Sequence, residues 1–297
     1  MPAKVLDGRL VAERIRSKVK LRMRELAGSI VEPHLVTILM GDDAASRAYL
    51  KNNQVAFGEV GIRLRAVVFD AKTTQRELEQ IIGELNDDKT VTGILLHLPL
   101  PAGLNETAGI SAISKEKDVD GLNPCNLGLL AYKTPSLVPC TPSGIIVLLK
   151  YYHVTIAGKH VVVINRSKPV GRPLSQLLLN EDATVTVCHS KTQDLVGISR
   201  TADILITGIG RRNEFVVGSN MIKPGAVVVD VGTSSVDGKI VGDVDFAAAL
   251  RTASYLTPVP GGVGPMTTCM LLYNSLKAAC LQSHVEMGLD INDLAVP

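Results

Sequence analysis

Apolar residues along the first hundred positions follow two spacings, one typical of helices and one typical of buried strands. A helix is predicted over 9–27, where apolar residues recur at every third or fourth position, namely Leu10, Val11, Ile15, Val19, Met23 and Leu26. Short runs rich in apolar and β-branched residues predict strands at 34–41, 63–70 and 91–101. Amphipathic segments predict further helices at 46–62 and 74–88. Strands that alternate with helices favour a parallel sheet in an α/β fold.

A second series of strands and helices begins near residue 159. Strands are predicted at 159–165, 183–190, 202–209 and 225–232, and a helix with proline near its start is predicted over 169–182. This order is typical of a Rossmann-like, doubly wound dinucleotide-binding domain. In the linking stretch 139–154, Thr141 or Ser143 is expected to cap a helix behind Pro142. A last helix over 266–282 is expected to return to the first domain.

These patterns predict two α/β domains. The first consists of residues 1–140 plus 268–297, and the second of residues 141–267. A length of 297 residues is sufficient for two hydrophobic cores.

Composition narrows the classes of partner. The net charge of +2 and an aromatic content of 3% without Trp give no reason to expect nucleic acid or a membrane surface. Five cysteines without a C-x-x-C pair or zinc-site spacing predict no metal site, and they favour reduced thiols in a cytoplasmic protein. No signal peptide or membrane-spanning run is expected, and an organelle form that has lost its transit peptide would look the same.

The first turn of the second series is the expected place for a dinucleotide phosphate. It reads "INRSKPVGRP" (164–173) and holds one glycine, Gly171, so it is a weak match to G-x-G-x-x-G. A lone G-x-G at Gly208 and Gly210 follows the third strand and is interpreted as a turn.

The end of the next strand indicates which dinucleotide is preferred. NAD-binding domains usually place an acid there, and here residues 188–192 (Cys, His, Ser, Lys, Thr) include none. Arg166 follows the preceding strand. Hydroxyl groups and a cation without a carboxylate suit a 2′-phosphate, which favours NADP over NAD. A solvated basic turn is the alternative.

Three loops combine prolines, glycines or acids. The loop 256–267 holds three prolines and three glycines, so it either lets another molecule approach closely or acts as a rigid hinge. "HLPLP" (97–101) and "KDVDG" (117–121) follow predicted elements of the first domain. An extended backbone would place only one of Asp118 and Asp120 in a cleft, and the more usual interpretation is a solvated turn.

Together these motifs resemble the FolD family of methylenetetrahydrofolate dehydrogenase/cyclohydrolases. The resemblance is carried in order by "VLDGR", "GDDAASRAY", "EVGI", "LPLP", "KDVDG", "PCTPSG", "RSKPVGRP", "ADILITGIG", "VGDVDF" and "TPVPGGVGPMT". It implies two α/β domains with a folate cleft between them, and a homodimer built through the nucleotide domains. It also implies oxidation of 5,10-methylenetetrahydrofolate by NADP, followed by hydrolysis of the methenyl product to 10-formyltetrahydrofolate.

The resemblance also assigns roles to individual positions. Tyr49 matches a tyrosine that lines the folate site, and Asp120 matches an aspartate that hydrogen-bonds the pterin ring. The remaining positions expected to contact substrate are Leu98, Pro99, Pro260, Gly261 and Gly262. The positions expected to contact the cofactor are Asn165, Arg166, Ser167, Val170, Gly171, His189, Ser190, Thr207, Gly208, Gly232 and Thr267.

Three positions depart from the family pattern. Asn53 stands where the family has a catalytic lysine, His97 where it has glutamine, and Asn165 where it usually has glycine. Hydride transfer needs alignment and no protein base, whereas hydrolysis needs a group that moves protons. Asn53 cannot titrate, so the dehydrogenase is expected to persist and the cyclohydrolase to be weak or absent.

His97 can be interpreted in two ways. An imidazole with an ordinary pKa of about 6.5 can act as a base near neutrality. Alternatively His97 hydrogen-bonds Asn53 and fills space, which is the more usual role of a single substitution. Two other functions remain open, namely a non-catalytic homologue that binds folate or nucleotide, and an NADP-dependent dehydrogenase of another substrate.

Overall fold

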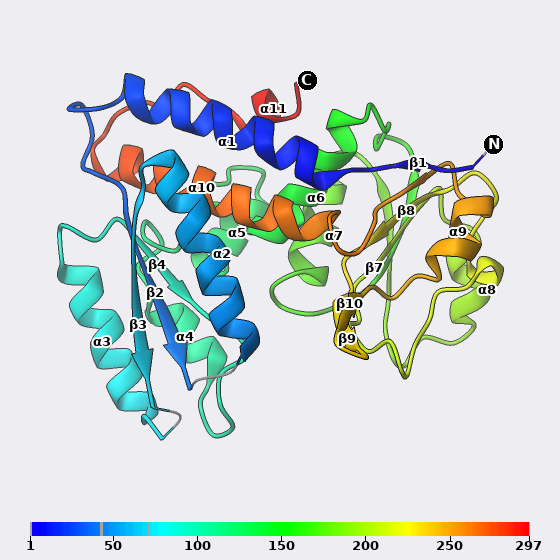
Figure 1. Cartoon of the computed structure of the whole chain (residues 1–297), viewed down its shortest axis with the longest axis horizontal. Coiled ribbons are helices and arrows are strands. Elements are labelled where there is room, and N and C mark those ends of the chain that lie inside the picture. Colours follow the sequence, from blue (N-terminus) through cyan, green and yellow to red (C-terminus); the bar gives the residue numbers. More distant parts are fainter. Residues whose placement is uncertain (1, 42–43, 71, 297) are drawn as a thin grey trace. The chain divides into compact units, whose positions relative to one another are not determined.

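The computed structural model describes residues 2–41, 44–70 and 72–296, and the side chains at 44–46, 48 and 49 lie outside this description. The chain divides into two compact units (Figure 1). The large-sheet unit comprises Met1–Arg14, Thr141–Thr267 and Ile291–Pro297, and the small-sheet unit comprises Ile15–Cys140 and Thr268–Asp290. The divisions after residues 140 and 267 coincide with the expected ones. Both chain ends group with the large-sheet unit, which differs from the expected assignment.

The large-sheet unit is built on six parallel strands. They are β1 (Lys4–Val5), β5 (His160–Ile164), β6 (Thr184–Cys188), β7 (Ile204–Thr207), β8 (Val227–Asp230) and β11 (Tyr255–Leu256). Their order is β1-β11-β8-β7-β5-β6, so the chain reverses direction across the sheet between β5 and β7. In doubly wound sheets, ligands bind outside the carboxyl ends of the strands at this reversal. The predicted nucleotide-binding topology is therefore present.

The two-residue strand β1 explains why the N-terminus belongs to this unit. Lys4 and Val5 pair in parallel with Tyr255 and Leu256 of β11. The sequence pattern did not predict this strand, because two residues are too few to show an alternation.

Short helices complete the large-sheet unit. They are α6 (Cys140–Tyr151), α7 (Gly171–Asn180), α8 (Leu195–Ser199), η1 (Ser219–Met221), α9 (Phe246–Thr252) and α11 (Ile291–Leu294). The expected cap of α6 is wrong, because the helix already begins at Cys140 and includes Thr141 and Ser143. Pro142 is tolerated in the first turn, where its missing N–H has no helical partner. A separate hairpin, β9 (Ser234–Val236) and β10 (Lys239–Val241), turns at Asp237 and Gly238, which both have positive φ.

The small-sheet unit has three parallel strands in the order β3-β2-β4. These are β2 (His34–Met40), β3 (Arg63–Phe69) and β4 (Gly93–Leu96), and the described helices are α2 (Ala44–Val60), α3 (Gln75–Asp87), α4 (Glu106–Ala112) and α5 (Pro124–Ala131). Helices α1 (Gly8–Glu25) and α10 (Val263–Gln282) contribute residues to both units. The expected helices and strands are confirmed, although β4 ends before His97.

One face of β2 and β4 packs against α3 and α4. Val36 and Ile38 of β2 join Ile94 and Leu96 of β4, and they pack with Leu78 and Ile82 of α3 and Ile110 of α4. Thr74 caps α3 in a reciprocal capping box with Glu77. None of the described helices is both long enough and apolar enough to cross a membrane.

The motif "KDVDG" connects this core to the site. The Lys117 ammonium is buried and donates to three carbonyl oxygens at the end of α3, those of Leu85 at 2.9 Å, Asn86 at 2.7 Å and Asp88 at 2.8 Å. Carbonyls in the last turn of a helix have no helical partner, and a cation there also complements the helix dipole. Lys117 therefore fixes the segment that leads to Asp120.

We expect Lys117→Met to lower the free energy of unfolding by about 2–4 kcal/mol, because it leaves buried carbonyls without a donor. Urea unfolding followed by circular dichroism measures this change. Lys115→Met is the matched control, since Lys115 is exposed and its ion pair with Glu116 spans 3.7 Å at the surface. Equal stability of the two variants would contradict the assigned role of Lys117.

Candidate functional site

Asn53 lies on α2 with its side chain 1% exposed. The Thr268 hydroxyl, on α10, donates to the Asn53 Oδ1 at 3.3 Å. The hydrogen bond that the structure describes for this carboxamide comes from Thr268, and a hydrogen bond between Asn53 and His97 stays a prediction. Tyr49 lies on the same helix, and its side chain is outside the described part of the chain.

The segment His97–Pro99 leaves the sheet directly after β4. The His97 backbone N–H donates to Ile38 O of the neighbouring strand at 3.0 Å, which extends the pairing by one bond. His97 and Leu98 are half-buried, Pro99 is exposed, and the Leu98–Pro99 peptide bond is cis. The pairing with β2 therefore fixes the backbone from which the imidazole projects.

Asp118 and Asp120 have different environments, so the expectation of a solvated turn is wrong. Asp118 is 2% exposed, and its Oδ2 accepts from Asn123 N at 2.7 Å and Asn126 Nδ2 at 2.8 Å. Asp120 is half-buried. Burial and, next, the neighbouring Asp118 carboxylate raise the pKa of Asp120 to about 7, although a hydrogen bond from the Cys140 thiol opposes the rise. Asp118 thus holds the turn, and Asp120 is left as a carboxyl group that titrates near neutrality.

Cys140 and Asn274 form the wall behind Asp120. Asn274 Nδ2 donates to Val119 O at 2.8 Å and to Val138 O at 2.7 Å, and it lies 3.5 Å from Cys140 Sγ. Burial, followed by the Asp120 carboxylate, raises the pKa of the Cys140 thiol well above its usual range. The protonated thiol is therefore a donor, shared between Val119 O at 3.3 Å and the Asp120 carboxylate. Asn274 was not among the predicted site residues, because it lies far from this segment in the sequence.

In the large-sheet unit, Asn165 bridges the turns that follow β5 and β7. Its Nδ2 donates to Gly208 O, and its Oδ1 accepts from Ser167 N at 2.6 Å. These are the two strands between which the chain reverses direction, so the side chain lies at the topological switch point. The departure from glycine at this position therefore links two turns that both carry predicted cofactor residues.

The turn between β5 and α7 is shaped to receive an anion. Ser167 Oγ accepts from Val170 N at 3.3 Å and Gly171 N at 3.4 Å, which are long bonds that a phosphate oxygen can replace. A Cβ atom on Gly171 would collide with the Asn165 carbonyl, so only glycine allows α7 to begin this close to β5. This is the packing role of the last glycine in dinucleotide-binding turns.

The carboxyl end of β6 contributes His189 and Ser190. Thr192 Oγ1 accepts from His189 N at 2.8 Å, and His189 Nδ1 accepts from Lys191 N at 3.1 Å, so the turn is closed on itself. Ser190 is exposed, as is Arg166 at the end of β5. Exposed hydroxyl and guanidinium groups without a carboxylate suit the 2′-phosphate of NADP.

Two buried aspartates hold the turns after β7 and β8. Asp243 accepts from Thr207 Oγ1 at 3.0 Å, Ile209 N at 2.6 Å and Gly210 N at 2.9 Å. Asp230 accepts from Gly232 N at 2.9 Å, Asp243 N at 3.0 Å and Val244 N at 2.8 Å. Burial raises the pKa of Asp230 to about 6. Sequence reasoning did not assign them a role, although Asp243 lies in the quoted motif "VGDVDF".

The loop before α10 carries Pro260, Gly261 and Gly262. Gly8 N donates to Gly261 O at 3.0 Å, and Gly262 N donates to Pro258 O at 2.8 Å. Gly261 has a φ of 112°, a value that favours glycine. Thr267 Oγ1 lies 2.9 Å from Thr141 Oγ1, which joins the first turns of α10 and α6. The loop is thus held by its own backbone.

The predicted site residues therefore form two groups. The small-sheet unit holds Asn53, His97, Leu98, Pro99 and Asp120, and the large-sheet unit holds all predicted cofactor residues together with Pro260, Gly261 and Gly262. Among the residues that the structure describes, no three His, Cys, Asp or Glu side chains gather as metal ligands would.

Comparison with known families matches both parts of the chain. Residues 6–120 match the model described as tetrahydrofolate dehydrogenase/cyclohydrolase, catalytic domain, and residues 139–283 match the NAD(P)-binding domain of the same description. The bifunctional protein FolD of Cenarchaeum symbiosum is 48% identical over 281 residues, which cover 95% of this chain and 100% of that protein.

Solved structures give the same result. The bifunctional FolD of Campylobacter jejuni is 43% identical with a TM-score of 0.89, and the match covers 93% of this chain and 98% of that one. The FolD of Trypanosoma brucei, solved with NADP and an inhibitor, is 40% identical with a TM-score of 0.87, over 94% of this chain and 97% of that one.

The Asp120 carboxyl group is expected to titrate near pH 7, which NMR of ¹³C-labelled aspartate measures. Asp118→Asn removes a neighbouring negative charge and should lower this pKa, whereas Cys140→Ala removes a donor and should raise it. Because the folded pKa lies above the ordinary value of 3.8, this group stabilises the fold at low pH, and its contribution is lost as pH rises towards 7. A rise of this pKa in Asp118→Asn, or a fall in Cys140→Ala, would contradict the assigned environment.

Proposed function

The chain belongs to the tetrahydrofolate dehydrogenase/cyclohydrolase family, and we propose that it oxidises 5,10-methylenetetrahydrofolate to the methenyl compound with NADP. The observation that carries this function is the set of turns at the carboxyl ends of the adjacent strands β5 and β6, which present exposed Arg166, exposed Ser190 and the amides at the start of α7. Asp120 provides a group for the pterin ring in the small-sheet unit. NADP supplies the hydride acceptor when it is bound.

The oxidation needs positioning rather than a protein base. The folate nitrogen lone pair expels the hydride, so the chain has to hold the two reactants in line. Asp120 in its ionised form accepts hydrogen bonds from ring N–H groups of a pterin. The loop 258–262 and the turns after β5, β7 and β8 are each held by the hydrogen bonds described above. Rigid surroundings of this kind support a competent dehydrogenase.

Hydrolysis of the methenyl product makes a different demand. Water must lose a proton as it attacks, and a further proton must move as the ring opens. The Asn53 carboxamide accepts or donates hydrogen bonds but does not titrate. We therefore propose that hydrolysis to 10-formyltetrahydrofolate is slow in this protein, and that His97 does not fully replace the missing amine.

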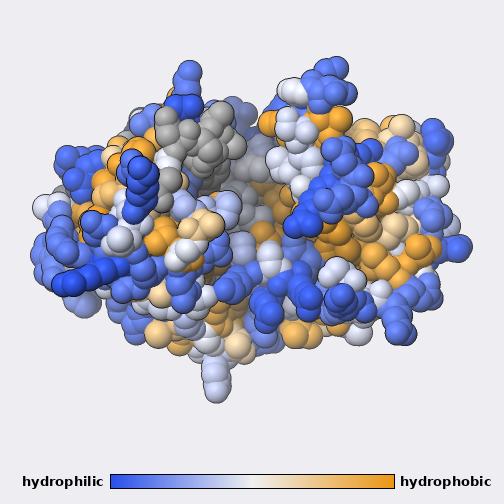
Figure 2. Space-filling model, turned by 90° about the horizontal axis from the view of Figure 1, so that it is seen from below, coloured by the Kyte–Doolittle hydropathy of each residue, from blue (hydrophilic) through white to orange (hydrophobic). Residues whose placement is uncertain are grey.

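We further propose that the protein acts as a cytoplasmic homodimer assembled through the large-sheet unit. The described cysteines are free thiols, which suits a reducing compartment. Strand β6 is an edge strand, and Val187 on it is 40% exposed. Leu179 of α7 and Val196 of α8 add exposed apolar side chains, and Figure 2 shows apolar residues on the surface of this unit. Exposed strand edges and apolar patches support pairing with a second chain.

Asn53→Lys combined with His97→Gln is expected to raise methenyltetrahydrofolate hydrolysis by about 10²-fold, the usual contribution of an acid–base group. At position 53 a lysine amine would be buried, and burial lowers its pKa towards neutrality. The decrease in methenyl absorbance measures the rate. NADP reduction with the methylene substrate, assayed in parallel, should change little.

Asn52→Lys is the matched control, because it adds the same amine at the exposed neighbouring position. Hydrolysis no faster in the double variant than in this control would show that the lysine position is not limiting. Rapid hydrolysis by the unmodified protein that is lost in His97→Ala would instead identify His97 as the base.

Light scattering at micromolar concentration should give twice the mass of the chain, and Val187→Lys should shift the mass towards the monomer because it places a charge on the edge strand. Lys239→Glu, on the exposed hairpin strand β10, serves as a control for a change of surface charge. A monomeric unmodified protein, or a dimer that both variants leave intact, would contradict assembly through β6.

A further inference from the structure

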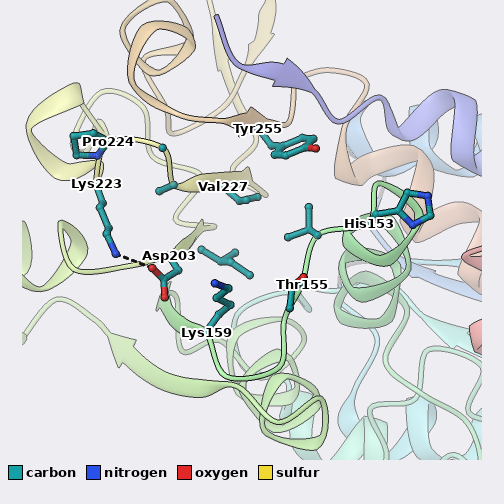
Figure 3. A pocket seen from close by; sticks show the side chains of 12 residues that line it. His153, Thr155, Lys159, Asp203, Lys223, Pro224, Val227 and Tyr255 are labelled. Atoms are coloured by element: carbon teal, nitrogen blue, oxygen red, sulfur yellow. Dashed lines mark hydrogen bonds and ion pairs between the residues drawn. The ribbon is translucent and has the colours of Figure 1, made fainter. Parts of the chain in front are cut away.

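A cavity of about 290 Å³ opens at the amino ends of the strands in the large-sheet unit. Its lining includes Val154, Lys159, Asp203, Lys223, Pro224 and Tyr255. These residues precede or begin β5, β7, β8 and β11 (Figure 3). The predicted cofactor residues that belong to these strands lie at their carboxyl ends or in the turns that follow. The cavity therefore belongs to the opposite edge of the sheet.

Positive charge is concentrated at this cavity. Lys159 and Lys223 line it, and the Lys4 ammonium lies 5.8 Å from the centre of the Tyr255 ring. Asp203 is the only acid among the lining residues. The two lining lysines and one aspartate leave a charge of +1 on the lining, and Lys4 adds a further cation beside Tyr255. Such a grouping attracts anions.

The single acid is already engaged within the protein. Asp203 Oδ1 accepts from Lys223 Nζ at 2.7 Å, and its Oδ2 accepts from His160 N at 3.0 Å. The hydrogen bond from Lys223 is the largest of the effects that lower the pKa of Asp203. In the described part of the chain, Lys159 forms no ion pair of its own, and Figure 3 shows it extending beside Asp203. Lys223 is therefore held in place by a hydrogen bond, whereas Lys159 is attracted to Asp203 by charge alone and can also contact a ligand.

The rest of the lining combines polar and apolar surface. Ile204 and Val227 are 1% and 8% exposed and form part of the floor, and Val154 and Pro224 add further hydrocarbon. The half-buried Tyr255 ring closes one side (Figure 3). Apolar surface beside a few convergent polar groups occurs in small-molecule sites, and this volume lies just below their usual range.

We propose that this cavity binds a small amphipathic organic anion, whose phosphate or carboxylate group contacts Lys159 and Lys223 and whose hydrocarbon part covers Val154, Pro224 and the Tyr255 ring. The site is separate from the cofactor edge. Strand β5 has five residues between the two edges, a length of about 16 Å at 3.3 Å per residue. The proposal does not depend on which reaction the protein catalyses.

Calorimetric titration with phenyl phosphate, with and without saturating NADP, tests the proposal on the full chain. We expect one molecule bound per chain, with an affinity that NADP does not change. Lys159→Gln should weaken binding about fivefold, the effect of one exposed charge contact of about 1 kcal/mol. Lys239→Gln is the matched control on the exposed strand β10 and should bind as the unmodified protein does.

Inorganic phosphate, used as a second probe, should bind more weakly than phenyl phosphate because it lacks the apolar part. Equal affinities of the two probes would overturn the amphipathic class of ligand. Absence of saturable binding, displacement of phenyl phosphate by NADP, or equal affinities of Lys159→Gln and Lys239→Gln would overturn the site itself. Lys159 is exposed, so loss of binding in its variant is not expected to reflect unfolding.

Discussion

Backbone N–H groups in the loops that carry the site need acceptors where no neighbouring strand provides them, and buried aspartates meet this need. Asp243 holds the turn after β7, Asp230 holds the turn after β8, and Asp118 holds the turn beside Asp120. A buried amide without an acceptor costs about 1–3 kcal/mol, and bonds to an ionised acceptor are stronger than neutral ones. The opposing cost is desolvation, which is visible in the raised pKa values of Asp118 and Asp230.

Loops fixed in this way serve the two family reactions unequally. Hydride transfer depends on the relative position of two bound molecules, and rigid turns provide that without a titrating group. Hydrolysis depends on moving protons, which geometry alone does not supply. The Thr268–Asn53 hydrogen bond shows that position 53 is well packed with a neutral side chain. The proposed separation of oxidation from hydrolysis thus rests on one buried position, which the surrounding structure accommodates.

Most of the sheet strands were predictable because their apolar runs are long enough to show a pattern, as in β2 and β5. Strand β1 was not predictable, since two residues carry no periodicity. The assignment of the N-terminus to a domain depended on this strand, because it pairs with β11. The site residues themselves came largely from motif resemblance. The residues that support them were not identified from the motifs. Asp243, Asn274 and Thr268 are distant in sequence from the groups they contact, and they lie beside them only in the folded chain. Asp118 was misjudged because a loop acid is usually solvated, and here its burial is determined by Asn123 and Asn126.

Strands β5 and β7 connect the two chemically different edges of the large sheet. At the carboxyl edge the Asn165 side chain joins their turns, and at the amino edge Asp203, just before β7, accepts from the first residue of β5. The pair is also bonded in register along its length, with Val161 opposite Ile204 and Ile164 opposite Thr207. Coupling between distant sites requires an element with two alternative arrangements. Two strands joined at both ends offer no such alternative, so a ligand at the amino edge should leave cofactor affinity unchanged unless this strand pair itself shifts.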